Sequence, residues 1–302
     1  ANLAAQPVSF QFKSRMGIES AVFAVAGTAA KPEWKTFKIA DGLQDSLFLS
    51  ILSDSRGNVW ASSQQGGVAR WDGFSWKKIT TADGLPTNYV FSLAEGKDGS
   101  IWFGTYGYGA VRSKDGAMTV YNAKNGMADV FAYSTAVAPD GSMWFGSHYN
   151  GVSRFDGSNW TKYSTAEGLV NNTVMAVAAS PDGTMWFGTN GSGLSRFDGK
   201  SWTTFTTADG LVSNYVSSLA AGKDGSVWTG HYASGENKGG ASRFTSGKWV
   251  KYSAADGLFS DYVSAITVSP GGDVWFGGYG GAARFDGKAF ETFTTADGLG
   301  HR

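Results

Sequence analysis

A tryptophan recurs at a nearly fixed interval along the chain. This interval limits the folds that the chain can adopt. The tryptophan occupies positions 60, 102, 144, 186, 228 and 275, so the successive intervals are 42, 42, 42, 42 and 47 residues. Around Trp186 the sequence SPDGTMWFGTNGSGLSRFDG (180–199) reads as a turn, a strand, a glycine-rich turn and a second strand that ends in Asp198-Gly199. A fixed period of this length indicates a repeat protein.

Each repeat has room for four short strands joined by tight turns. In the second unit the expected strands are Val90–Glu95, Ser100–Gly104, Ala110–Arg112 and Met118–Tyr121. Asp98-Gly99 and its equivalents suit hairpin turns, because glycine adopts the positive φ that short loops need. No segment has the 3.6-residue period of an amphipathic helix. The pattern predicts an all-β fold, a β-propeller of four-stranded blades.

Six repeats are complete, and we expect them to form a single propeller domain over residues 1–302. They span 43–84, 85–126, 127–168, 169–210, 211–257 and 258–298. Residues 1–42 lack the tryptophan motif, but Trp34–Phe37 and the following Ala40-Asp41-Gly42 match the end of the later units, and Val8–Lys13 and Ala21–Ala26 are further candidate strands. We therefore expect seven blades, with 1–42 as a degenerate blade; six blades with an N-terminal appendage is the alternative.

Composition excludes several classes of function. The 25 basic and 25 acidic side chains balance, so no net field attracts nucleic acid or an anionic membrane. Cysteine is absent, which excludes disulfides and thiolate metal sites. No apolar run approaches the roughly 18 residues of a membrane-spanning helix. We expect no cofactor, no metal, no nucleic-acid partner and no direct membrane insertion.

Residues that recur in every unit are best explained by blade structure. The repeated tryptophans are expected in the core. An arginine also recurs, and because a partly buried charge needs a partner, we expect it to pair with a repeated acid. The arginines are Arg70, Arg112, Arg154, Arg196, Arg243 and Arg284, and the candidate acids are Asp83, Glu167, Asp209, Asp256 and Asp297.

Positions that vary between units are the better guide to a binding site, because variable loops on a rigid scaffold commonly carry function. Two families of loops emerge on one face of a propeller, those between the second and third strands and those between one blade and the next. The candidate binding residues there are Tyr89, Tyr106, Tyr108, His148, Tyr149, Asn150, Asn190, Tyr215, His231, Tyr232, Tyr262 and Tyr279. Neighbouring positions on the same face add Gln64, Gln65, Asn88, Phe131, Tyr133, Asn172, Ser192, Asn214 and Asp261. Aromatic rings with amide and hydroxyl groups suit a carbohydrate, another polar ligand or a partner protein.

Catalysis is the alternative hypothesis. His148 and His231 lie two units apart, and Glu236 is near His231 in the five-residue insertion of the fifth unit. General acid–base chemistry needs a histidine within hydrogen-bond reach of its target. A catalytic zinc would need a third ligand, and no third histidine lies in the repeat frame. We therefore commit to no catalytic residue, and His148, His231 and Glu236 remain candidates.

The repeat resembles a known family. The pattern Gly-Leu, Asp-Gly-x-x-Trp-Phe-Gly-Thr and Gly-x-x-Arg-Phe-Asp, seen over 182–189 and its surroundings, is similar to the two-component regulator propeller repeat, which forms the extracytoplasmic sensor region of hybrid histidine kinases. The resemblance implies a ligand-binding, sensory role in the periplasm or outside the cell. A weaker similarity is to virginiamycin B lyase-type propellers, which implies a lyase or hydrolase using His148 or His231. The acidic residue that often follows Trp-Phe in those lyases is replaced here by Gly104, Gly146 and Gly188.

Overall fold

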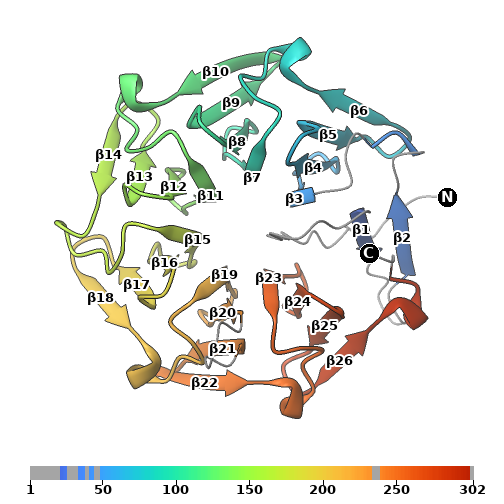
Figure 1. Ribbon diagram of the computed structural model, residues 1–302, viewed down its shortest axis with the longest axis vertical. Helices are drawn as coiled ribbons and strands as arrows, with labels where there is room; N and C mark the ends of the chain where they lie inside the picture. The colour runs from blue at the N-terminus through green and yellow to red at the C-terminus, as the bar shows by residue number, and fades with distance from the viewer. Residues whose placement is uncertain (1–20, 26–32, 38–40, 44–47, 233–238, 300–302) are drawn as a thin grey trace.

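The computed structural model describes residues 21–25, 33–37, 41–43, 48–232 and 239–299. Six antiparallel four-stranded sheets in this part of the chain stand around a common centre as the blades of a β-propeller (Figure 1). Each blade consists of four consecutive strands, so that the first lies next to the centre and the fourth lies at the rim. Among the described residues, no helix is long and apolar enough to cross a lipid bilayer.

The strands follow the repeat closely. The innermost strands are β3 (Phe48–Ser53), β7 (Val90–Glu95), β11 (Ala132–Val137), β15 (Val174–Ala179), β19 (Val216–Ala221) and β23 (Val263–Val268). The second strands are β4 (Val59–Ser63), β8 (Ile101–Thr105), β12 (Met143–Ser147), β16 (Met185–Thr189), β20 (Val227–His231) and β24 (Val274–Gly278). The third strands are β5 (Val68–Trp71), β9 (Ala110–Lys114), β13 (Val152–Phe155), β17 (Leu194–Phe197), β21 (Gly240–Thr245) and β25 (Gly281–Phe285). The outer strands are β6 (Trp76–Ile79), β10 (Ala117–Tyr121), β14 (Trp160–Tyr163), β18 (Trp202–Phe205), β22 (Lys248–Tyr252) and β26 (Phe290–Phe293).

The prediction of seven blades is wrong, and the structure matches the six-bladed alternative. The N-terminal strands β1 (Ala21–Val25) and β2 (Glu33–Phe37) form a separate two-stranded sheet. It lies between the first blade and the last (Figure 1). The physical reason is that residues 1–42 carry the outer-strand motif without the tryptophan-bearing second strand that packs each complete blade. The candidate strand Val8–Lys13 lies outside the described residues.

The motif TTADGL, which ends several units, forms a short 3-10 turn. This turn was not predicted, because no segment of the sequence has a helical period. In η2 (Thr81–Asp83) the Thr80 hydroxyl accepts from the Ala82 N–H, and the Asp83 carboxylate accepts from the Thr80 N–H at 2.9 Å. Gly84 ends the turn at φ 101°, a conformation that glycine adopts without strain. The same turn recurs at η3 (Ala123–Asn125), η4 (Thr207–Asp209), η5 (Ala254–Asp256) and η6 (Thr295–Asp297).

The repeated tryptophans form the core, as predicted. Each is at most 6% exposed. Four of them pack against a phenylalanine on the second strand of the following blade, namely Trp60 on Phe103 (6.2 Å between ring centroids), Trp102 on Phe145 (5.6 Å), Trp144 on Phe187 (5.6 Å) and Trp228 on Phe276 (5.3 Å). The large buried rings thus pack neighbouring blades against one another.

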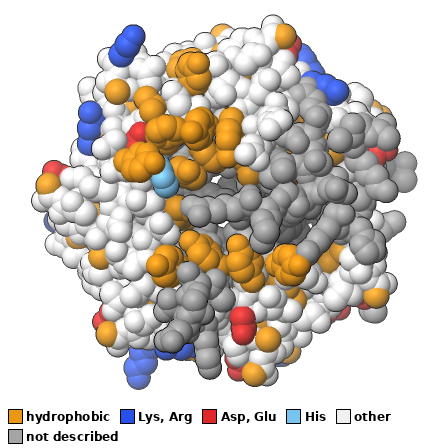
Figure 2. All heavy atoms as spheres, in the orientation of Figure 1, with side chains coloured by type: hydrophobic (Ala, Val, Ile, Leu, Met, Phe, Trp, Pro, Cys, Tyr) orange, Lys and Arg blue, Asp and Glu red, His pale blue; other side chains and the backbone are white. Residues whose placement is uncertain are grey.

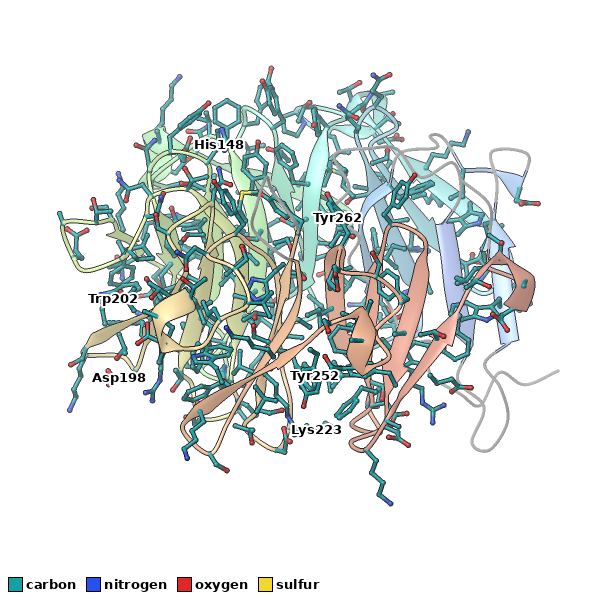
Figure 3. All side chains as sticks on the ribbon, turned by 60° about the horizontal axis from the view of Figure 1, so that its bottom comes forward. His148, Asp198, Trp202, Lys223, Tyr252 and Tyr262 are labelled. Atoms are coloured by element: carbon teal, nitrogen blue, oxygen red, sulfur yellow. The ribbon has the colours of Figure 1, made fainter. Side chains whose placement is uncertain are left out.

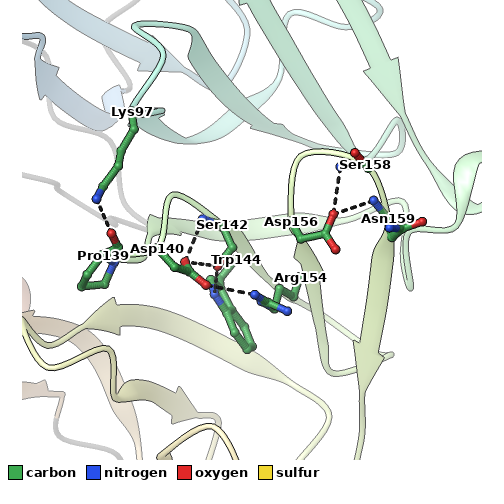
Figure 4. Close-up of polar contacts among 9 residues, drawn as sticks. All are labelled: Lys97, Pro139, Asp140, Ser142, Trp144, Arg154, Asp156, Ser158 and Asn159. Carbon is green, nitrogen blue, oxygen red and sulfur yellow. Dashed lines mark hydrogen bonds and ion pairs between the residues drawn. The ribbon is translucent and has the colours of Figure 1, made fainter.

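Among the described residues, four of the six repeated arginines form an ion pair, and their partners are not the acids predicted. Arg154 pairs at 2.9 Å with Asp140, in the turn between the first two strands, and its guanidinium lies 5.7 Å from the centroid of the Trp144 ring (Figure 4). The acids expected as partners, such as Asp83, cap the 3-10 turns instead. The prediction fails because these acids are already held by the backbone N–H groups that begin their own turns.

Candidate functional site

The two families of variable loops lie on one face of the propeller, which we call the variable face. Figure 3 shows His148 on this side and Lys223, in a turn between the first two strands of a blade, on the opposite side. The view in Figure 2 shows hydrophobic side chains gathered in two bands on either side of the centre. The ring contacts define two groups of aromatic residues on the variable face.

The first group is a continuous cluster from the second and third blades, which we call the seven-ring cluster. Its members are Tyr89, Phe91, Tyr106, Phe131, Tyr133, His148 and Tyr149. Tyr89 stacks on Tyr106 at 4.9 Å with an angle of 11° between the rings, and Phe91 stacks on Tyr133 at 4.2 Å. The His148 ring lies 5.0 Å from Tyr133 and 4.1 Å from Tyr149. Mutual packing fixes these rings in place before any ligand arrives.

Part of the seven-ring cluster is open to solvent. Tyr106 is 47% exposed and Tyr149 is 60% exposed, and the neighbouring Tyr108 is 48% exposed. Large exposed aromatic side chains grouped on one face are unusual for a surface without a partner. Flat rings with hydroxyl groups at their edges can stack on the apolar face of a ligand while the hydroxyl groups donate to its polar atoms.

The second group comes from the fourth, fifth and sixth blades, and we call it the tyrosine row. Tyr232 lies 5.8 Å from Tyr215 and 6.0 Å from Tyr262. The Tyr232 hydroxyl donates to the Asn190 side-chain oxygen at 3.2 Å, and Asn190 also forms an isolated β-bridge with Tyr215. Tyr279 is 54% exposed in the last blade. The structure thus places most of the predicted residues in two groups, and Asn190 belongs to the second.

A cavity of about 220 Å³ lies between the two groups. Tyr89, Phe91 and Tyr133 line it from one side, and Tyr232 and Tyr262 line it from the other. Every innermost strand also contributes its second residue, in the order Leu49, Phe91, Tyr133, Met175, Ser217 and Ser264. A ligand that enters this cavity at the centre would therefore contact residues from all six blades.

The sequence analysis missed five of these six inner-strand residues, since it named only Tyr133. The signal was present, because the position occurs once in every unit with the same spacing as the tryptophan and carries five different residue types. The inner-strand residues that the first four blades contribute are apolar or aromatic. The other side carries Ser217, whose hydroxyl donates to the Gly230 and Val263 carbonyl oxygens at 2.9 and 2.7 Å, and Ser264.

Asp129 is a further residue that was not predicted from the sequence. It is 5% exposed, and one carboxylate oxygen accepts from the Val130 and Phe131 N–H groups at 2.7 and 3.2 Å. The other oxygen accepts from the Tyr149 N–H at 3.1 Å. The carboxylate therefore ties the loop that bears Phe131 to the loop that bears Tyr149, and both rings belong to the seven-ring cluster.

His231 lies inside its blade and not on the variable face. It is fully buried, with Nδ1 3.2 Å from the Tyr215 carbonyl oxygen and Nε2 2.7 Å from Thr229 Oγ1 and 2.9 Å from Ser242 Oγ. Because a carbonyl oxygen only accepts, Nδ1 carries the proton and Nε2 accepts from a hydroxyl. Burial lowers the pKa of His231 to about 4, although the Tyr215 carbonyl opposes that change. The arrangement is that of a neutral structural histidine.

Several other predicted residues support loops. The side-chain oxygens of Asn88, Asn172, Asn214 and Asp261 each accept from a backbone N–H of the turn that precedes them, at 2.9 Å. Asn150 donates its backbone N–H to Ser147 Oγ at 3.0 Å. Glu236 lies outside the described residues. Within the described ranges, no group of three or more histidine, aspartate or glutamate side chains is placed to hold a metal ion.

The chain is similar to known proteins both in sequence and in fold. The family model described as two component regulator propeller matches residues 84–107 and 168–191. This confirms the resemblance inferred from the repeat. The matched segments run from the end of one blade into the Trp-Phe-Gly-Thr strand of the next, which are the stretches that carry the motif. No curated protein matches the chain significantly.

Solved structures share the fold at low sequence identity. The extracellular domain assigned to a hybrid two-component system of B. thetaiotaomicron, BT3049, has 20% identity and a TM-score of 0.72, with 83% of this chain and 34% of that chain covered. This chain thus spans about a third of the length of that relative. Virginiamycin B lyase of Staphylococcus aureus, in a catalytically inactive form with quinupristin, has 17% identity and a TM-score of 0.68, with 91% and 92% covered. PorZ, a surface component of the type-IX secretion system of Porphyromonas gingivalis, has 12% identity and a TM-score of 0.65, with 98% and 46% covered.

Proposed function

We propose that this propeller is a non-catalytic recognition domain that binds a polar ligand, with a carbohydrate as the leading class, on its variable face. The observation that supports the proposal is the pairing of exposed tyrosines in the seven-ring cluster with a cavity that all six blades line. Sugar rings present apolar C–H faces and hydroxyl edges, and aromatic rings with nearby amide and hydroxyl groups complement both. In this proposal Tyr106, Tyr108 and Tyr149 form the outer contact surface.

The family resemblance supports a sensory or interaction role. Two similar structures are described as extracellular domains assigned to a hybrid two component system and a one component system of B. thetaiotaomicron. We propose by analogy that this domain acts outside the cytoplasm and reports binding to a partner. Rigid rings on a closed propeller fit such a role, because a preorganised surface loses little conformational entropy when it binds.

Acid–base catalysis has less support from the geometry. His231 is enclosed in its blade, and both of its ring nitrogens have protein partners. A general acid or base must reach the substrate. His148 lies among the aromatic rings of the variable face, where it is suited to contact a ligand, and it is the histidine through which a lyase or hydrolase activity would have to operate.

The experiment is a glycan and peptide binding screen, followed by titration calorimetry on the best ligand. We expect the double variant Tyr106→Ala/Tyr149→Ala to lose about tenfold or more in affinity, which corresponds to about 1.4 kcal/mol. Phe74→Ala is the matched control, because Phe74 is an aromatic residue that is 91% exposed in a turn on the opposite face. Unchanged affinity in the double variant, or an equal loss in the control, would contradict the proposal.

A further inference from the structure

The first blade lacks the arginine–aspartate pair that four other blades share; the fourth blade keeps the aspartate, Asp182, without an ion pair to Arg196 among the described residues. In four blades the arginine of the third strand pairs with an aspartate of the first turn, as Arg112–Asp98, Arg154–Asp140, Arg243–Asp224 and Arg284–Asp273. In the first blade, the positions that correspond to Asp140 and Asp273 carry Arg56 and Asn58. In the first blade, arginine and asparagine thus occupy the positions from which the paired blades supply the carboxylate.

The carboxylates near Arg70 have other partners. Asp54 is 8% exposed, and its two oxygens accept from the Arg56 and Asn58 backbone N–H groups, the Asn58 side chain and the Trp60 indole at 2.8–3.0 Å. Asp83 is held by Thr80. Among the described residues, no carboxylate forms an ion pair with Arg70, and its guanidinium lies 5.8 Å from the centroid of the Trp60 ring.

These cations line a cavity of about 410 Å³ between the first and second blades. Arg56, Arg70, Lys77 and Lys114 contribute positive charge to its wall, against Asp54, Asp83 and the exposed turn residue Asp115. Lys114 is the one cation of the four with an ion pair, at 3.1 Å to Asp98. With the oxygens of Asp54 and Asp83 already hydrogen-bonded, the wall presents free donors for an anion.

The third and fourth blades provide an internal comparison. The equivalent cavity there is about 220 Å³ and contains Asp140, Trp144 and Arg154. Figure 4 shows that the Asp140 carboxylate fills the position beside the Arg154 guanidinium. The cavity between the first two blades is larger, and its buried carboxylate, Asp54, is bonded to its own turn and to Trp60 and forms no ion pair with Arg70.

We propose that this cavity binds the oxyanion group of a small acidic ligand, a carboxylate, sulfate or phosphate, in the place that an aspartate occupies in the other blades. The forked guanidinium groups of Arg56 and Arg70 supply several N–H donors, and such charge-assisted hydrogen bonds are stronger than neutral ones. The site lies between blades and is separate from the variable face.

The test is titration calorimetry with sodium sulfate, sodium phosphate and sodium glucuronate, each balanced with sodium chloride to constant ionic strength. We expect one of these anions to bind with a 1:1 stoichiometry. Arg56→Asp restores the pairing of four other blades and should weaken that binding by about tenfold or more, the contribution of at least one charge-assisted hydrogen bond. Arg56→Gln removes the charge without adding a new one and should weaken it in the same direction.

Lys200→Asp is the matched control. It makes the same change in net charge in an exposed turn of the fourth blade, and it should leave the anion affinity unchanged. Absence of binding to the wild-type protein by all three anions would overturn the proposal. So would full affinity in Arg56→Asp and Arg56→Gln, or a loss in Lys200→Asp as large as that in Arg56→Asp.

Discussion

Trp34 in β2 packs edge-on against Phe293 in β26, with 5.3 Å between the ring centroids. Trp34 also lies 6.2 Å from Trp275 in the same last blade. Three residues further along β2, Phe37 packs 5.0 Å from Trp71 and 5.4 Å from Trp76 in the first blade. One strand of five residues thus contacts both the first and the last blade, and closes the gap between them through aromatic rings.

Trp34→Ala should therefore destabilise the whole ring. Trp34 is partly buried, so we expect the free energy of unfolding to fall by about 2 kcal/mol, below the 3–5 kcal/mol typical of a core tryptophan. Urea unfolding followed by tryptophan fluorescence measures the change. Phe74→Ala removes a ring that is 91% exposed and should change the free energy of unfolding by less than about 0.5 kcal/mol. Equal stability of the two variants would show that β2 does not close the ring.

The fold could be predicted from the sequence because each blade is a local unit. Four strands and their turns lie within about 42 residues, so hydrophobic spacing and Asp-Gly turns were sufficient, and the predicted Val90–Glu95 is the observed β7. The number of blades depends on contacts between the two ends of the chain. Those contacts are made by Trp34 and Phe37, whose motif resembles an outer strand but does not show whether a complete blade accompanies it.

The candidate site could be predicted only in part, because loop membership does not show which way a side chain points. His231 and Tyr232 are adjacent, yet His231 is buried and Tyr232 lines the central cavity. Neighbouring residues of a strand point to opposite sides, and the positions equivalent to His231 include the buried Thr105 and Thr189. Alternation along the strand thus accounts for the placement of His231. The tie from Asp129 to Tyr149 joins residues 20 positions apart and has no pattern in the sequence.

Gly188→Ala should weaken the contact between the fourth and fifth blades. A Cβ atom at Gly188 would lie 2.5 Å from Val216 Cγ1 on the neighbouring innermost strand, closer than real side chains approach. The close approach of Val216 explains why glycine occupies this position. We expect a loss of about 1–3 kcal/mol in the free energy of unfolding, the cost of overpacking a core.

Gly271→Ala is the control for this substitution. A Cβ atom there would be 3.8 Å from the nearest neighbouring atom, Ser269 Oγ, and its φ is not in the left-handed region. The free energy of unfolding of Gly271→Ala should stay within about 0.5 kcal/mol of that of the wild type. If urea unfolding gave the same stability for Gly188→Ala and Gly271→Ala, close packing of the blades at Gly188 would be contradicted.

Asp129→Asn should loosen the seven-ring cluster without changing its rings. The amide group that replaces one carboxylate oxygen cannot accept from the Tyr149 N–H while the remaining oxygen keeps Val130 and Phe131. An unpaired buried N–H costs about 1–3 kcal/mol, and because the Tyr149 N–H is only partly buried we expect a loss of stability of about 1 kcal/mol. Hydrogen exchange should speed up at Tyr149 and leave Asn190 unchanged. Equal exchange at Tyr149 in the variant and the wild type would contradict this positioning role.

Stability between pH 7 and pH 5 should depend on His231. Burial lowers its pKa from 6.5 to about 4, so in this range the unfolded chain binds a proton that the folded protein does not. The stabilisation is fully present above pH 6.5 and is lost as the pH falls toward 4. The free energy of unfolding should therefore fall by about 2 kcal/mol from pH 7 to pH 5 through this group. In His231→Gln that decrease should disappear, whatever the variant's absolute stability, while His148→Gln should retain it. A decrease of the same size in His231→Gln, measured by urea unfolding at both pH values, would assign it to another group.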